Sequence, residues 1–232
     1  MGSYFFRVAA DTHRFALLLG VFLILMLANP IFEGTRAAGF VGDTIYYIFL
    51  AAAAYSVRRS RFFSLAIILG AAAILAELAG YFIDRKSVMV VATGLASAYL
   101  LVVTVLILGN LARQERISAD TVMGGLCVYI LIGVLWTSLF VNQELIAPGS
   151  FDFGRHAARS GTPGFYGLLF YYSFISLLTI GFGDVIPVSG MAQTLTILEG
   201  LIGRFYLVFY MAYLINLYIS RKERSDPAES AG

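Results

Sequence analysis

Six consecutive residues in the C-terminal part of the chain have types and spacing suited to binding a cation. They are Thr179-Ile180-Gly181-Phe182-Gly183-Asp184, in which two glycines flank one aromatic residue. Glycine adopts positive φ without a steric penalty, so alternating it with ordinary residues lets successive backbone carbonyls turn to the same side. Several carbonyls that face one axis replace the water shell of a dehydrated cation. The Thr179 hydroxyl is expected to add a further oxygen at the inner end.

A short apolar stretch, 164–178, leads into this run. A helix needs about 20 apolar residues to cross the hydrocarbon, so this stretch predicts a re-entrant helix, with Thr162 suited to cap it and Pro163 to its first turn. Its C-terminal end carries partial negative charge, which stabilises a cation held there. Irregular backbone at membrane depth occurs only inside protein or beside water, so we expect the run that follows to line a pathway.

Six further stretches are long and apolar enough to cross a membrane as helices. Together with the re-entrant helix they predict an all-α membrane protein with six transmembrane helices, a pore helix and a filter loop, the last two lying between helices 5 and 6. The first stretch is longer than the apolar region of a cleavable signal, and we interpret it as a retained anchor. The six stretches run over 15–32, 41–57, 62–83, 88–110, 120–146 and 190–219.

Composition agrees with a membrane protein. Of 232 residues, 59% are hydrophobic and 13% are charged, whereas soluble domains are nearer half apolar and a quarter charged. The net charge of +2 is too small to indicate a nucleic-acid partner. Cys127, the one cysteine, is expected to be a buried hydrophobe. No grouping of His, Cys, Asp or Glu has metal-ligand spacing and no serine nucleophile motif occurs, so we expect no enzyme activity.

Lysine and arginine predict the orientation. With the N-terminus inside, the inner segments hold ten of these residues and the outer loops five. Because the excess lies on the cytoplasmic side of membrane proteins, both termini are expected in the cytoplasm. The predicted location is the plasma membrane, or the inner membrane if the source is bacterial, with several passes.

Residues 165–219 resemble the pore of the potassium channel family. The usual filter of that family is Thr-Val-Gly-Tyr-Gly-Asp; here Ile180 stands for Val and Phe182 for Tyr, and both variants occur in the family. The resemblance implies K⁺ as the permeant ion, no organic cofactor, and ion-binding groups at Thr179, Ile180, Gly181, Phe182 and Gly183. One chain supplies one strand of an oxygen ring, so we expect a homotetramer in membrane lipid, with no nucleic acid and no evident soluble partner.

Other positions carry the same resemblance. Tyr171 and Tyr172 stand where many members have an aromatic pair, and Ser176 where a threonine is common. Pro187 follows the filter at the expected offset. Gly203 lies nineteen residues after Asp184, where the inner helix of the family often has a hinge glycine. The residues expected to support the filter are Tyr171, Tyr172, Ser176, Asp184 and Glu199.

The layout of six helices also resembles voltage-gated members of the family, up to helix 4. Voltage-sensing helices carry a basic residue at every third position, but 88–110 contains no Lys, Arg, Asp or Glu. We therefore expect a sensor-like domain without gating charges at 1–113, a pore domain at 114–220 and a short cytoplasmic tail at 221–232.

Two charges lie inside the last apolar stretch, and intramembrane charges are candidate functional groups. Glu199 is expected to brace the back of the filter by accepting hydrogen bonds; the alternative is a water-exposed carboxylate near the vestibule. Arg204 is expected to leave the axis and pair with Glu199 of its own or a neighbouring chain. If Arg204 faced the cavity, four copies would repel K⁺.

Two other functions compete with a passive potassium channel. Potassium uptake transporters have related loops, but carry four degenerate ones in one long chain, each usually keeping one glycine, whereas this chain has one loop with the full Gly-Phe-Gly. A non-conducting or regulatory channel-like subunit remains an alternative because of Arg204. The sequence leaves the gating stimulus open among membrane tension, lipid, pH and constitutive opening.

Overall fold

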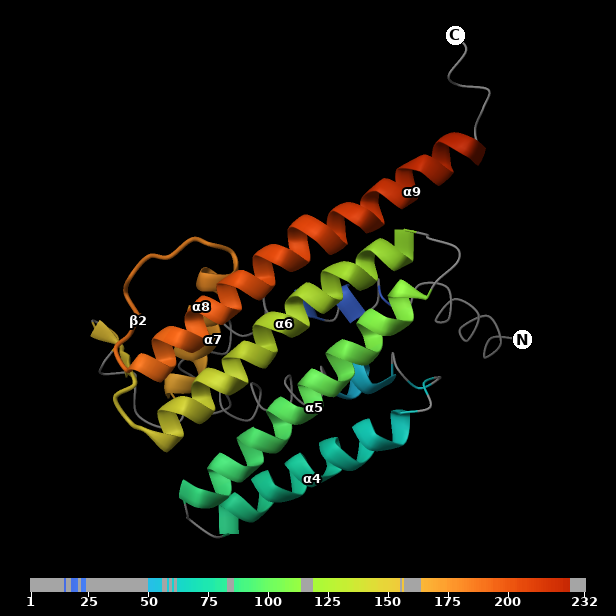
Figure 1. The fold of residues 1–232 in the computed structure, drawn as a ribbon. Coiled ribbons are helices and arrows are strands. Elements are labelled where there is room, and N and C mark those ends of the chain that lie inside the picture. The colour runs from blue at the N-terminus through green and yellow to red at the C-terminus, as the bar shows by residue number, and fades with distance from the viewer. Residues whose placement is uncertain are drawn as a thin grey trace. The chain divides into compact units, whose positions relative to one another are not determined.

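The fold is given by a computed structural model, which describes residues 15, 18–20, 22–23, 50–55, 58, 60, 62–82, 86–113, 119–154, 156 and 164–225 (Figure 1). Helices dominate it. They are α4 (Phe63–Phe82), α5 (Lys86–Ala112), α6 (Ala119–Ile146), α7 (Gly164–Leu177), α8 (Gly190–Phe205), the π-helical segment η2 (Tyr206–Met211) and α9 (Ala212–Ser225). Two short strands are present, β1 (Phe151–Asp152) and β2 (Ile186–Pro187).

Four helices among the described residues are long and apolar enough to cross a membrane. They cover Phe63–Gly80, Lys86–Ala112, Ala119–Ile146 and Gly190–Leu217, and the last runs through α8, η2 and the start of α9 as one helix (Figure 1). These coincide with four of the six expected stretches. The expected helices at 15–32 and 41–57, and the expected cap at Thr162 and Pro163, lie wholly or largely outside the described residues.

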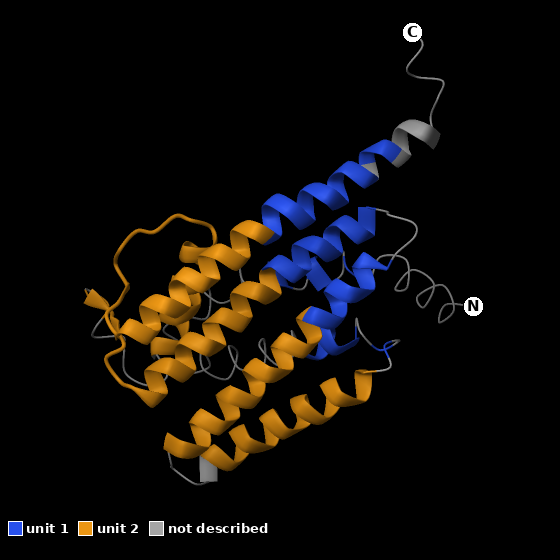
Figure 2. Ribbon diagram, in the orientation of Figure 1, with its two compact units in different colours: residues 1–60, 105–129, 206–232 blue, residues 61–104, 130–205 orange. Residues whose placement is uncertain are grey.

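The chain forms two compact units (Figure 2). One comprises residues 1–60, 105–129 and 206–232, and the other comprises 61–104 and 130–205. The second unit contains the short apolar helix α7 and the glycine-rich run. The expected division at 113 and 220 follows the order of segments along the chain and stays a prediction.

In the second unit, small side chains let the helices approach closely. A Cβ on Gly70 of α4 would lie 3.1 Å from the Tyr99 ring of α5. The hydroxyls of Ser97 in α5 and Ser138 in α6 are 2.8 Å apart and buried. Pairing polar groups across helices in this way satisfies them where water is absent.

The first unit packs η2 against α6. The Tyr206 hydroxyl donates to the Gly125 carbonyl at 2.6 Å, and a Cβ on Gly125 would lie 2.6 Å from Met211 Sδ. Cys127 is buried and contacts the Phe15 carbonyl at 3.5 Å. A larger residue than glycine at 125 would force the side chains of Met211 and Leu214 to shift.

A two-stranded antiparallel sheet departs from the expected all-α fold. Strands β1 and β2 pair Phe151 with Pro187 and Asp152 with Ile186. The backbone amides of Val188 and Ser189 also donate to the carbonyl of Ser150, at 2.9 and 3.2 Å. Strands of two residues have no periodicity to detect in a sequence, but this pair fixes the segment after the glycine-rich run to the end of α6.

Candidate functional site

Helix α7 ends in a hydrogen-bonded turn that leads into the glycine-rich run. The N–H of Ile180 donates to the carbonyl of Ile175 at 2.8 Å, and the N–H of Thr179 donates to the carbonyl of Ser176 at 3.0 Å. These two bonds form a Schellman motif, in which the first residue beyond the cap is left-handed and is usually glycine. Thr179 holds that position with a φ of 61°.

Left-handed residues then alternate along the run. Thr179, Gly181 and Gly183 have φ of 61°, 59° and 73°. A Cβ built on Gly181 or Gly183 would meet nothing within 4 Å, so the sign of φ, and not lack of space, requires glycine there. The sequence predicted this freedom at the two glycines, but it contained no signal for a positive φ at Thr179, a rare and costly conformation for a β-branched residue.

The first amides of the run face back toward α7. Besides the bond from Ile180, the N–H of Gly181 reaches the same Ile175 carbonyl at 3.3 Å. Because these amides are bound on the side of α7, the carbonyls of the run are available on the opposite side. Ile180 and Phe182 are 50% and 69% exposed in the single chain, so these apolar side chains are available for contact with lipid or with further chains.

Asp184 ends the run and is held by two side chains. The Tyr171 hydroxyl donates to its Oδ2 at 3.0 Å, and His156 Nε2 lies 3.2 Å from the same atom. Burial opposes ionisation of Asp184, but hydrogen bonds from Tyr171, its own backbone and His156 outweigh that effect, and the pKa of Asp184 lies below its usual value. The carboxylate is therefore a charged anchor that ties the C-terminal end of the run to α7.

Tyr172 anchors α7 on a different helix. Its hydroxyl lies 2.8 Å from Thr196 Oγ1 in α8, and Thr196 gives its single proton to the Ala192 carbonyl at 2.8 Å. Tyr172 is thus the donor to Thr196. Its ring packs edge-on against Phe140 and Phe151, with centroids at 5.3 and 5.4 Å.

The side chain of Glu199 in α8 lies against α7. Its side chain is fully buried, and its Oε1 is 2.5 Å from the Ser173 hydroxyl. The same hydroxyl lies 2.8 Å from the Gly133 carbonyl of α6. This burial excludes the alternative of a water-exposed carboxylate.

The expected pair of Glu199 and Arg204 does not form within the chain. Arg204 is exposed, whereas Glu199 is fully enclosed and contacts Ser173. Residues five positions apart point roughly 140° away from each other around a helix, which puts the two side chains on different faces of α8. Glu199 has no exposed surface for Arg204 of an adjacent chain either.

Gly203 is buried in α8, three residues before the start of η2 at Tyr206, where the helix widens. Single π-helical turns inside α-helices are frequent at functional sites. The hinge expected at Gly203 stays a prediction, and η2 adds a second irregularity that no sequence pattern indicated.

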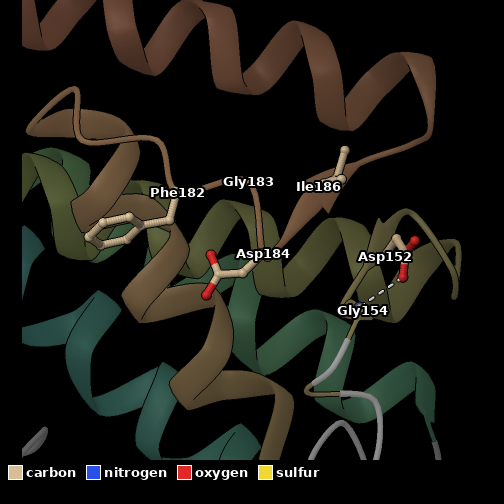
Figure 3. Close-up of a pocket in the computed structure, with 6 residues that line it drawn as sticks. All are labelled: Asp152, Gly154, Phe182, Gly183, Asp184 and Ile186. Carbon is tan, nitrogen blue, oxygen red and sulfur yellow. Dashed lines mark hydrogen bonds between the residues drawn. The ribbon is translucent and has the colours of Figure 1, made fainter.

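An open pocket of about 410 Å³ lies at the C-terminal end of the run (Figure 3). Two carboxylates line it from different segments: Asp184, and Asp152 of β1, whose Oδ1 accepts from the Gly154 amide at 2.9 Å. Acidic groups at a mouth raise the local concentration of cations. The lining residues are Asp152, Gly154, Phe182, Gly183, Asp184 and Ile186.

Three residues that hold this site were not predicted from the sequence: Ser173, Gly133, and His156 in its contact with Asp184. Ser173 and His156 lie 26 and 28 positions from their partners, so spacing carried no signal. Gly133 has one, because glycine inside a helix is disfavoured and usually has a packing reason. A Cβ on Gly133 would lie 2.9 Å from Phe174 Cζ.

Comparison with known proteins agrees with this geometry. Residues 161–220 match the family model described as "Ion channel". The "Uncharacterized membrane protein YdjJ" of Bacillus subtilis (strain 168) is 27% identical over 108 residues, which are 47% of this chain and 32% of that protein. The chain thus spans about a third of that relative's length. No solved structure matches the chain. The family match supports an ion channel and not an enzyme, and the apolar helices with this relative indicate a membrane protein.

Proposed function

We propose that the chain is one subunit of a homotetrameric potassium channel that conducts K⁺ passively across the plasma membrane, with both termini in the cytoplasm. Residues 179–183 form the filter, and K⁺ binds at Thr179, Ile180, Gly181 and Phe182. Asp184, Tyr171, Tyr172, Ser176 and Glu199 support it. Opening does not depend on charges in α5.

One observation carries this proposal: positive φ at every second residue from Thr179 to Gly183, directly after the C-terminal end of α7. Alternation of this kind turns successive carbonyls toward one side, and the negative end of the α7 dipole favours a cation there. Four such strands around an axis supply the oxygen rings that replace the hydration of K⁺. The match of residues 161–220 to an ion-channel family model supports the same reading.

The test is ion flux in liposomes that contain the purified protein alone. Reversal potentials under bi-ionic conditions should give K⁺ and Rb⁺ similar permeability, with Na⁺ well below both. Equal permeability of Na⁺ and K⁺ would contradict a potassium filter. The mass of the protein in detergent tests the tetramer in parallel.

A second candidate, a non-conducting or regulatory channel-like subunit, is favoured by one observation. Arg204 is exposed near the middle of the apolar span Gly190–Leu217, where a cation facing the cavity would repel K⁺. Absence of flux from the wild-type protein, with flux restored by Arg204→Gln, would favour this candidate. Flux from the wild-type protein alone excludes it.

A further inference from the structure

Three helices of the second unit meet at one serine hydroxyl. Ser173 Oγ of α7 lies 2.8 Å from the Gly133 carbonyl of α6 and 2.5 Å from Glu199 Oε1 of α8. Ser173 and Glu199 are both fully buried, so water does not compete for these contacts. The absence of a side chain on Gly133 permits the close approach, since a Cβ there would lie 2.9 Å from Phe174 Cζ.

The number of hydrogens at this point is informative. A serine hydroxyl has one proton, and a backbone carbonyl can only accept. If Glu199 were ionised, two contacts of hydrogen-bond length would share the single proton of Ser173. If Glu199 carries a proton, Oε1 donates to Ser173 Oγ, and Ser173 donates to the Gly133 carbonyl. Both contacts are then hydrogen bonds.

The surroundings of Glu199 agree with a neutral carboxyl. Its Oε2 is buried and has no partner among the described residues, which is costly for an ionised carboxylate and less so for a neutral one. Within the part of the chain that the structure describes, Glu199 contacts the Ser173 hydroxyl and no cation pairs with it. Helix α7 carries no charged residue, and α6 carries only Asp120 and Glu144, near its ends. On its own helix, Arg204 is exposed.

Tyr172 of α7 interacts electrostatically with Glu199, and its hydroxyl is hydrogen-bonded to Thr196 in α8. It supplies no positive charge. These contacts favour a proton on Glu199. The carboxyl in α8 then donates to Ser173 in α7, and Ser173 donates to the Gly133 carbonyl in α6.

We propose that Glu199 is a neutral hydrogen-bond donor and a positioning residue, which fixes α7 between α6 and α8 through Ser173. The inference rests on the proposed function in one respect: it takes the glycine-rich run, which this contact helps to position, to be the ion filter. Ser173 lies two residues before Ile175, whose carbonyl binds the first amides of the glycine-rich run. Loss of the proton leaves a buried anion and two acceptors for the single proton of Ser173, so one of the two contacts that fix α7 is lost.

The protonation state is tested by infrared spectroscopy of the purified wild-type protein and the Glu199→Gln variant near neutral pH. The difference spectrum should contain the carbonyl stretch of a protonated carboxyl group that the variant lacks. Carboxylate bands in its place would overturn the proposal. This measurement does not need conduction, so it remains decisive even if the wild-type protein carries no K⁺ and the proposed function fails.

The positioning role is tested by K⁺ flux in liposomes over a range of pH. Glu199→Gln keeps a neutral donor and should conduct like the wild type near neutral pH, whereas Glu199→Ala should lose about tenfold, as expected for a lost buried hydrogen bond. Ser173→Thr should retain flux and Ser173→Ala should lose it. Wild-type flux should fall as the pH rises through the ionisation of Glu199, and that of Glu199→Gln should not.

Two flux results would refute the role. If Glu199→Gln is as impaired as Glu199→Ala, the charge of the carboxylate is required and the donor assignment is wrong. If Glu199→Gln shows the same fall at alkaline pH as the wild type, another group is responsible for it. Size-exclusion profiles identify any variant that fails to assemble. Where a variant fails, the infrared comparison tests the proposal in place of the flux assay.

Discussion

Replacing Gly181 with alanine isolates the conformational requirement of the glycine-rich run. The residue has a φ of 59°, and nothing lies within 4 Å of a Cβ built on it, so the change adds no clash within the chain. The left-handed conformation costs an ordinary residue about 1–2 kcal/mol. Four chains around one axis would pay it together, about 4–8 kcal/mol per tetramer.

Gly109 in α5 and Gly167 in α7 are matched controls. A Cβ on either would also meet nothing within 4 Å, but both lie in helices and neither has positive φ. Alanine is favoured over glycine in a helix by up to about 1 kcal/mol. The same chemical change should therefore be destabilising at Gly181 and neutral or stabilising at the two controls.

Thermal unfolding of the purified protein and K⁺ flux in liposomes measure the difference. Gly181→Ala should lower the unfolding temperature and abolish flux, because the peptide either stays strained or rotates its carbonyl away from the axis. A variant that matches Gly109→Ala in both assays would refute the reasoning. Lower stability with unchanged flux would confirm the backbone geometry but remove this carbonyl from the ion pathway.

Three other changes test the rest of the structure. Because the pKa of Asp184 is lowered in the folded state, the ionised carboxylate stabilises the fold above the usual pKa of aspartate, and this stabilisation is lost as the pH falls through the lowered value. Tyr171→Phe removes a hydrogen bond that lowers the pKa of Asp184, so acid unfolding of the variant should begin at higher pH. An unchanged midpoint of acid unfolding would contradict the contact. Gly125→Ala places a Cβ 2.6 Å from Met211 Sδ and should cost about 1–3 kcal/mol in thermal unfolding, a prediction that fails if the variant is as stable as Gly109→Ala. Helix α5 carries no charge after Lys86, and a gating charge supplies about 2.3 kcal/mol per 100 mV, so conductance should vary little with voltage; a steep conductance–voltage curve would show that another segment senses it.

The sequence predicted the features that depend on local properties. Four apolar stretches became helices of membrane-spanning length because length and hydropathy suffice to identify them. The stretch 164–178 became α7, and the glycines at 181 and 183 took positive φ, because glycine is the residue that adopts it without strain. These features need no knowledge of what packs against them.

Contacts between distant segments could not be predicted in the same way. Charge alone suggested that Glu199 pairs with Arg204, but a buried carboxyl can bind a hydroxyl, and which one depends on how α7 and α8 pack. Thr179 was expected to contribute a hydroxyl oxygen, and nothing in its type indicated a left-handed backbone. That conformation follows from the helix end that it closes, which only the fold reveals.

The Schellman end of α7 has a consequence for moving this loop between proteins. The Ile175 carbonyl belongs to the helix, yet it accepts the amides of Ile180 and Gly181, so helix and loop share one hydrogen-bonded turn. A graft limited to residues 179–183 would lack that acceptor and would have to find another in its new host. The smallest piece that carries its own geometry begins at Ile175, and sequence change in the last turn of the helix is constrained by the loop that follows it.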